Sequence, residues 1–290
     1  MEECKIMYKA VFIDIDGTLR DDKQNISEKT KEMIKRVTQE GILVILCSGR
    51  PRKYTEELSR ECFASKYIIT SGGSSVYDYE KDEVLYLNRM NKQACIKLYY
   101  IAEKAKVRFI MNVGENRVVN QLKYFDGTEL ELKTDIETFV RENEVLQCVI
   151  SDSDFNKIKA IKGEIEKVEG VEIKNQSKNL MTETKMERKD GYCDVANRET
   201  SKGNGIEKLC QILQIDVKDT IGIGDDFNDI AMFQTVGYAV VMGNANDKVK
   251  QYADEVTKSN EEEGVAVFLE KLLKQIKEKK DEINRTNPKL

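Results

Sequence analysis

The sequence predicts an α/β protein in which a doubly wound parallel sheet carries an inserted α/β domain. Three observations support this fold class. Short apolar runs alternate with helical patterns in the first and last parts of the chain, as in parallel sheets covered by helices on both faces. Acidic residues directly follow the first of these runs and a later one. Between residues 83 and 192 the alternation gives way to a mixed pattern.

The strands of the main sheet are expected to be short and buried, because each corresponds to an apolar run. These runs cover residues 10–13, 42–46, 66–70, 220–223 and 238–241. Helices are expected at about 28–40 with Ser27 as N-cap, after Pro51, at about 203–213 and after Asp229. The last helix is expected to begin near Glu261 and to fade into a frayed or disordered charged tail, residues 274–290.

The middle of the chain begins with a predicted hairpin at 75–79 and 84–87, followed by mixed helices and strands. The helices are expected at 91–106, 135–142 and 155–167, and the strands at 107–113, 117–121, 145–150 and 171–175. This stretch has no acidic strand end like the first one. We therefore expect residues 1–82 and 193–290 to form the main domain and residues 83–192 to form the insertion.

Composition restricts the function. The 290-residue chain has a net charge of −5 and no basic cluster, which argues against nucleic acid or an anionic membrane as the main partner. No apolar run approaches the ~18 residues that span a bilayer, and seven scattered cysteines without a Cys-x-x-Cys pair favour free thiols in the cytoplasm. The absence of histidine excludes Ser-His-Asp triads and histidine-based zinc sites, so acid–base chemistry falls to other side chains.

Asp14 and Asp16 are the first candidates for that chemistry. They follow the strand at 10–13 and precede Gly17 and Thr18. Ligands of parallel α/β sheets bind outside the carboxyl ends of the strands, where an acidic pair suits a hard cation such as Mg²⁺. The alternative is an ordinary loop, because Asp-Gly is a common turn dipeptide.

Further candidates lie at other strand and helix ends: Ser48, Lys202, Asp225, Asn228 and Asp229. Each also has a purely structural interpretation. Ser48 could cap a turn, Lys202 could be a solvated helix lysine, and Asp225 and Asp226 could be N-caps of the following helix.

Together these residues form motifs that resemble the haloacid dehalogenase superfamily of aspartyl-phosphate enzymes, and more closely its Cof-type sugar-phosphatase branch with a class IIB cap. The matching motifs are Asp-x-Asp-Gly-Thr at 14–18, Ser-Gly-Arg at 48–50, Ser-Lys-Gly at 201–203, Gly-Asp-x-x-Asn-Asp at 224–229 and Met-Gly-Asn-Ala at 242–245. The insertion stands where that family carries its cap, the domain that selects the substrate. The resemblance implies a Rossmann-like core beneath it.

The resemblance also implies roles for these residues. Asp14 would attack phosphorus and form an aspartyl-phosphate, and Asp16 would protonate the leaving oxygen and then activate water. Mg²⁺ would be held by Asp14, Asp225 and the main-chain carbonyl of Asp16, with Asp229 supporting the metal site. The residues expected to hold the phosphate are Gly17, Ser48, Gly49, Lys202 and Asn228.

The expected function is that of a cytoplasmic, Mg²⁺-dependent phosphatase acting on a small phosphorylated metabolite, such as a sugar phosphate, as a monomer or weak homodimer. Two alternatives stay open at this point. One is a phosphomutase of the phosphomannomutase type, which shares these motifs, and the other is a phosphosugar-sensing module without catalysis.

Overall fold

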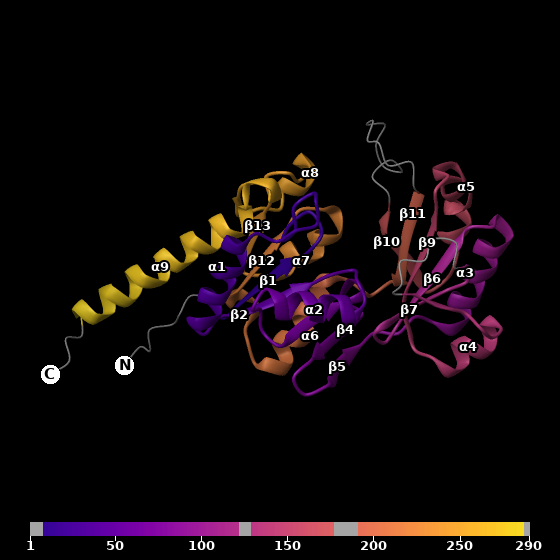
Figure 1. Ribbon diagram of the computed structural model, residues 1–290, viewed down its shortest axis with the longest axis horizontal. Coiled ribbons are helices and arrows are strands. Elements are labelled where there is room, and N and C mark those ends of the chain that lie inside the picture. The colour runs from indigo at the N-terminus through magenta and orange to yellow at the C-terminus, as the bar shows by residue number, and fades with distance from the viewer. Residues whose placement is uncertain (1–7, 122–128, 177–190, 287–290) are drawn as a thin grey trace.

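The computed structural model describes residues 8–121, 129–176 and 191–286, and within them it contains two sheets (Figure 1). The larger sheet has eight strands in the order β14-β13-β12-β1-β2-β3-β4-β5. Its strands are β1 Ala10–Asp14, β2 Leu43–Cys47, β3 Tyr67–Thr70, β4 Ser75–Asp78, β5 Glu83–Leu87, β12 Thr220–Gly224, β13 Tyr238–Val241 and β14 Glu255–Val256. The five predicted strands are present, and β14 is a two-residue edge strand without a sequence signal.

Helices cover both faces of this sheet because successive side chains of its strands point to opposite faces. In β1, Val11 and Ile13 pack toward α1 (Glu28–Gln39) and α9 (Gly264–Thr286), whereas Ala10 and Phe12 belong to the core cluster on the other face. The remaining helices of this domain are α2 Arg52–Glu61, α6 Lys202–Leu213, α7 Ile230–Thr235 and α8 Asp247–Lys250. The strands β1, β2, β3, β12, β13 and β14 run parallel, so the predicted doubly wound fold class is confirmed.

The smaller sheet has the order β10-β11-β9-β6-β7-β8. Its strands are β6 Arg108–Val113, β7 Asn116–Val119, β8 Glu129–Glu131, β9 Val145–Asp152, β10 Val171–Gln176 and β11 Gly191–Asn197. Three helices, α3 Lys92–Ala105, α4 Ile136–Glu142 and α5 Phe155–Ile165, share one apolar core with this sheet. In Figure 1 they lie on the side of the sheet away from the main domain, so the opposite face of the sheet is turned toward that domain.

Sheet membership differs from the expected domain boundaries at both junctions. Residues 83–87 form β5, which pairs with β4 as the second half of the predicted hairpin and so stays in the larger sheet. At the other junction, β11 continues to Asn197 and lies between β9 and β10, with Cys193 and Val195 buried in the core of the smaller sheet. Divided by their sheets, the two domains meet after Leu87 and after Asn197.

The expectation of a frayed tail was wrong for residues 274–286, because α9 continues as a helix to Thr286 and extends beyond the main sheet (Figure 1). Leu272 and Ile276 belong to or pack against the core on the α1 side. Farther along, Lys280 forms an ion pair with Glu40 at the end of α1. Among the described helices, α9 included, none has the apolar stretch that crossing a membrane requires.

The described cysteines agree with the expectation of free thiols. Cys47, Cys62, Cys95, Cys148, Cys193 and Cys210 are buried and unbridged, and Cys4 lies outside the described residues.

Gly73 lies in the loop after β3 and packs directly against the start of α6. Its φ is +102°, and a Cβ at this position would lie 1.9 Å from the Ser201 carbonyl oxygen. Ser201 in turn caps α6, because its side chain accepts a hydrogen bond from the Asn204 amide. Only a residue without a side chain can sit this close to the first turn of α6.

We expect Gly73→Ala to lower the free energy of unfolding by about 2–4 kcal/mol, because the methyl group adds both strain at positive φ and a backbone clash. The matched control is Gly163→Ala in α5, where nothing lies within 4 Å of an added Cβ. That change should raise stability by about 0.5–1 kcal/mol through helix propensity. Urea unfolding followed by circular dichroism measures both, and equal midpoints for Gly73→Ala and the wild type would contradict the assignment.

Candidate active site

The predicted site residues come from four separate segments, and the structure brings them to the carboxyl-end edge of the main sheet. These segments are the loops after β1, β2 and β12 and the first turn of α6. They form the floor of a cleft of about 630 Å³ between the main domain and the insertion. The predicted residues that line this cleft are Asp14, Asp16, Gly17, Ser48, Gly49, Asp225 and Asn228. Lys202 and Asp229 are buried next to Asp14.

Lys202 is the centre of the buried charges. Its side chain is 2 % exposed, and its Nζ forms ion pairs with Asp14 Oδ1 and, at 2.5 Å, with Asp229 Oδ1. Burial by itself would lower the pKa of Lys202, but the two carboxylates outweigh that effect and raise the pKa above its usual value. Lys202 is therefore a buried, charged ammonium group, and the alternative of a solvated helix lysine is wrong.

Asp229 holds the loop after β12 in place. Its Oδ2 accepts hydrogen bonds from the Asp225 amide at 3.0 Å and the Asp226 amide at 3.1 Å. The Asp226 side chain accepts a hydrogen bond from the Phe227 amide at 2.9 Å and forms a capping box with Asp229, so the N-cap interpretation holds for Asp226. Both Asp229 oxygens are thus engaged by protein donors, which suits a supporting role.

Asp225 points toward the first loop. Its carboxylate accepts a hydrogen bond from Thr18 Oγ1 at 3.2 Å and lies 3.4 Å from Asn244 Nδ2. Asn244 Nδ2 also donates to the Gly17 carbonyl at 2.9 Å. Gly17 has φ +85°, and a Cβ there would lie 2.5 Å from Asp225 Oδ2. The glycine is therefore required for the two loops to approach this closely.

Oxygen atoms of Asp14, Asp225 and Asp229 lie within 4.8 Å of one another, close enough to surround a cation. Burial raises the pKa of Asp14, Lys202 opposes this rise, and the carboxylates of Asp229 and Asp225 add to it. Three carboxylates against one ammonium group leave uncompensated negative charge. An all-oxygen donor set with that charge fits a hard divalent cation such as Mg²⁺.

Asp16 lies on the other side of the cleft floor, where Arg50 holds it by two hydrogen bonds. Arg50 Nε and Nη2 each donate to a different Asp16 oxygen at 3.0 Å, and the guanidinium lies 5.0 Å from the centre of the Tyr54 ring. The Ser48 hydroxyl accepts a hydrogen bond from the Arg50 amide at 3.1 Å, so Ser48 caps a turn as well as lining the cleft. Arg50 belongs to the Ser-Gly-Arg motif, but nothing in the sequence indicates that it pairs with Asp16.

The insertion forms the opposite wall of the cleft with Asn112, Arg117, Val149, Asn175, Tyr192 and Asp194. Sequence reasoning missed all of them, because they belong to no motif. The available signal was the alternation of polar and apolar residues along strands such as β11, where Tyr192 and Asp194 flank the buried Cys193. That alternation shows which face of the strand a residue occupies, but it does not show that this face lines a cleft.

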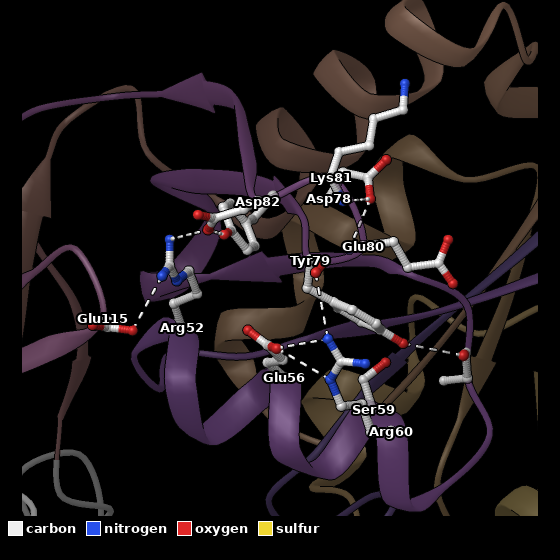
Figure 2. Close-up of polar contacts among 12 residues, drawn as sticks. Arg52, Glu56, Ser59, Arg60, Asp78, Tyr79, Glu80, Lys81, Asp82 and Glu115 are labelled. Atoms are coloured by element: carbon white, nitrogen blue, oxygen red, sulfur yellow. Dashed lines mark hydrogen bonds and ion pairs between the residues drawn. The ribbon is translucent and has the colours of Figure 1, made fainter.

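One polar contact between the domains lies beside the cleft at the start of α2 (Figure 2). Arg52 Nη2 lies 3.1 Å from Glu115 Oε2 of the β6–β7 turn, and its other terminal nitrogen lies 3.9 Å from Asp82 of the β4–β5 turn. The guanidinium also stacks on Tyr77 at 4.1 Å from the ring centre. Arg52 follows the Ser48–Arg50 loop by two residues, so one short segment touches both the cleft and the insertion.

Comparison with known proteins identifies the class to which this fold and site belong. Residues 11–269 match the model of the haloacid dehalogenase-like hydrolase family, and the chain belongs to that family. The resemblance inferred from the motifs, and with it the expectation of an enzyme, is confirmed.

Among its relatives are two proteins of Bacillus subtilis (strain 168) named 5-amino-6-(5-phospho-D-ribitylamino)uracil phosphatase. YcsE is 28 % identical, and the match covers 89 % of this chain and 93 % of YcsE. YwtE is 26 % identical, and the match covers 91 % of this chain and 98 % of YwtE. Among solved structures, a haloacid dehalogenase-like hydrolase from Bacteroides thetaiotaomicron matches with a TM-score of 0.78 and 25 % identity, over 91 % of this chain and 99 % of its own. The subclass IIB sugar phosphatase BT4131 shares the fold, with a TM-score of 0.74 and 23 % identity over 90 % and 98 %.

The buried ion pairs of Lys202 lead to a stability prediction. We expect Lys202→Met to lower the free energy of unfolding by about 3–5 kcal/mol in metal-free buffer, because it leaves two buried carboxylates without their partner. Lys208→Met on the same helix is the control and should change stability by less than about 1 kcal/mol. Adding Asp14→Asn to Lys202→Met should recover part of the loss. Chemical denaturation checks all three, and equal stability of Lys202→Met and Lys208→Met would contradict the prediction.

Proposed function

We propose that this hydrolase is a Mg²⁺-dependent phosphatase that removes the phosphoryl group of a small phosphorylated metabolite through an aspartyl-phosphate on Asp14. One observation carries the proposal: a carboxylate at the base of the cleft is paired with a buried ammonium group, and a second carboxylate, Asp225, lies close enough to share a cation with it. The phosphatase names of the relatives support the reaction class. Sugar phosphates are one substrate class to consider, since BT4131 acts on them by its name.

Asp14 can serve as the nucleophile because Lys202 engages only its Oδ1, which leaves Oδ2 for attack on phosphorus. A phosphate monoester repels an anionic nucleophile, and Lys202 reduces that repulsion as a fixed positive charge. The residues that would hold Mg²⁺ are Asp14, Asp225 and the main-chain carbonyl of Asp16, and the bound ion would neutralise further charge on the phosphoryl group.

The transferring phosphoryl oxygens would be held by donors that line the same floor. These are the Ser48 hydroxyl, the amides near Gly17 and Gly49, and the Asn228 side chain. Such donors stabilise the transition state because they are fixed before the reaction begins. Ser48 as a whole residue is 1 % exposed, so its side chain has little room to turn away from this position.

Asp16 would protonate the leaving oxygen and later take a proton from the water that hydrolyses the aspartyl-phosphate. Positioned acid–base catalysis of this kind contributes roughly 10²–10⁴-fold. Arg50 would act as a positioning residue, because its two bonds fix the plane of the Asp16 carboxylate at the cleft.

Cytoplasmic location and a monomeric or weakly dimeric state stay predictions.

We expect Asp14→Asn to reduce phosphate release from p-nitrophenyl phosphate by about 10⁴-fold or more, because the amide keeps the shape of the side chain and loses its nucleophilic charge. Asp247→Asn is the matched control, since the Asp247 side chain is fully exposed on α8. It should retain wild-type turnover. Near-normal single-turnover release by Asp14→Asn would rule out the covalent route.

We also expect exhaustive chelation to abolish turnover and Mg²⁺ or Mn²⁺ to restore it, because all the candidate ligands are oxygen atoms. Binding should be visible without any reaction: at a Mg²⁺ concentration 100 times Kd, the free energy of unfolding should rise by about 2.7 kcal/mol. Asp225→Asn should weaken both responses. Full activity after chelation, or an unchanged melting temperature at saturating Mg²⁺, would contradict the metal assignment.

A further inference from the structure

The sheet of the insertion presents a row of polar residues to the cleft. Strand pairing places Arg117 opposite Asn112 and Asn112 opposite Gln147, and it places Asp194 between Val149 and Asn175. The alternate residues of the same strands pack in the apolar core with α3, α4 and α5. Because successive side chains of a strand point to opposite faces, this row is held on the cleft face by the core behind it.

Asn112 is the most constrained residue of the row. It is 2 % exposed, and its Nδ2 donates to Gln147 Oε1 at 2.9 Å and lies 3.5 Å from the Gly49 carbonyl and from Ser71 Oγ. Its side-chain oxygen, Oδ1, is buried and has no hydrogen-bond partner among the described residues. A buried acceptor without a partner is costly and uncommon, and Asn112 is among the residues that line the cleft, beside the Ser48–Arg50 loop.

Asp194 is a second acceptor in the same row, farther along the sheet. Burial raises its pKa to about 7, Arg117 and Arg50 oppose the rise, and Asp16 adds to it. Asp194 lines the same cleft as Asp16 and Arg50, on the wall that the insertion forms. It offers oxygen atoms to a molecule that lies between the two domains.

The positive charge behind this wall is balanced only when Asp194 is counted, because Arg108 and Arg117 share a single carboxylate, Glu129. Arg117 lies 3.6 Å from Glu129, a carboxylate whose side chain is 1 % exposed and which also forms an ion pair with Arg108. Beyond Arg117, the wall contributes the acidic Asp194 and neutral side chains. A second phosphate group on the substrate would find no surplus of positive charge there, whereas hydroxyl groups would find acceptors.

On this basis, and resting on the proposed function, we propose that Asn112 is a specificity-determining residue whose side-chain oxygen accepts a hydrogen bond from a hydroxyl of the leaving group close to the phosphate ester. Asp194 accepts a second hydrogen bond from a hydroxyl farther from the ester. The preferred substrate is then the monophosphate of a neutral, polyhydroxylated compound. A bisphosphate, as used by phosphomutases, is disfavoured by the same wall.

Two pairs of alkyl phosphates test this directly, because the members of each pair differ only in their hydroxyl groups. They are glycerol 3-phosphate with propyl phosphate, and glucitol 6-phosphate with hexyl phosphate. For each pair the ratio of kcat/KM values is measured on one protein preparation. That ratio does not depend on the fraction of the protein that is correctly folded, so a destabilised variant still gives an answer.

The wild type should favour the hydroxylated member of each pair by tenfold or more. Asn112→Ala should lower the ratio by about tenfold for both pairs, as expected for the loss of one hydrogen bond. Asp194→Ala should lower it for the six-carbon pair and leave the three-carbon pair close to the wild type. The control is Asn116→Ala in the same hairpin, at an exposed position outside the cleft, and it should keep both wild-type ratios.

An unchanged ratio in Asn112→Ala would overturn the assignment, as would a wild type that hydrolyses propyl phosphate as well as glycerol 3-phosphate. Preference for glucose 1,6-bisphosphate over glucose 6-phosphate would overturn the charge argument. Failure of the proposed function looks different: the wild type would then release no phosphate from p-nitrophenyl phosphate with Mg²⁺, and the inference would fall with it. If the wild type hydrolyses p-nitrophenyl phosphate but Asn112→Ala keeps the wild-type ratios of kcat/KM for both substrate pairs, this inference is wrong and the proposed function stands.

Discussion

The pairing of Lys202 with Asp14 and Asp229 is the interaction on which the rest of the site depends. A buried ammonium group is tolerated only when carboxylates surround it, so β1, the start of α6 and the turn after β12 must meet at one point. Their close approach requires residues without side chains, such as Gly73 against Ser201 and Gly17 against Asp225. The main sheet thus brings together the charged side chains of Lys202, Asp14 and Asp229, which are far apart in the sequence.

The two domains divide the chemistry of the proposed reaction. The main domain supplies the charged groups that every phosphate monoester needs, and these lie in loops fixed by Asp229, Asn244 and Arg50. The insertion would supply a hydrogen-bonding surface for the part of the substrate that varies. That surface is one face of a sheet whose other face is packed against helices.

The sequence was informative where structure and chemistry are local. An apolar run followed by Asp14, Ser48 or Asp225 predicts both a buried strand and a polar group at its end, and the structure has both. The sequence was uninformative where pairing is remote: residues 191–197 could not be assigned to a sheet without their partner strands. Asn112 and Asp194 escaped notice for the same reason, because only the register across β6, β9 and β11 brings them to the cleft. Residues 84–87 were different, because the predicted hairpin already paired them with 75–79 and the expected boundary at 83 divided that hairpin. The helix over 274–286 was not predicted because a dense run of charges is also typical of a disordered tail. In the structure, Lys280 and Ile276 anchor this helix to the α1 side.

The ion pair of Arg52 with Glu115 is one of the contacts that join the insertion to the main domain. It is an ion pair whose partners are partly exposed, and such pairs contribute little net stability in water. At this point the insertion and the main domain are therefore held by a bond that solvent can replace readily. Separation of the two domains at this point therefore breaks a partly exposed ion pair, and such a contact weakens as the salt concentration rises.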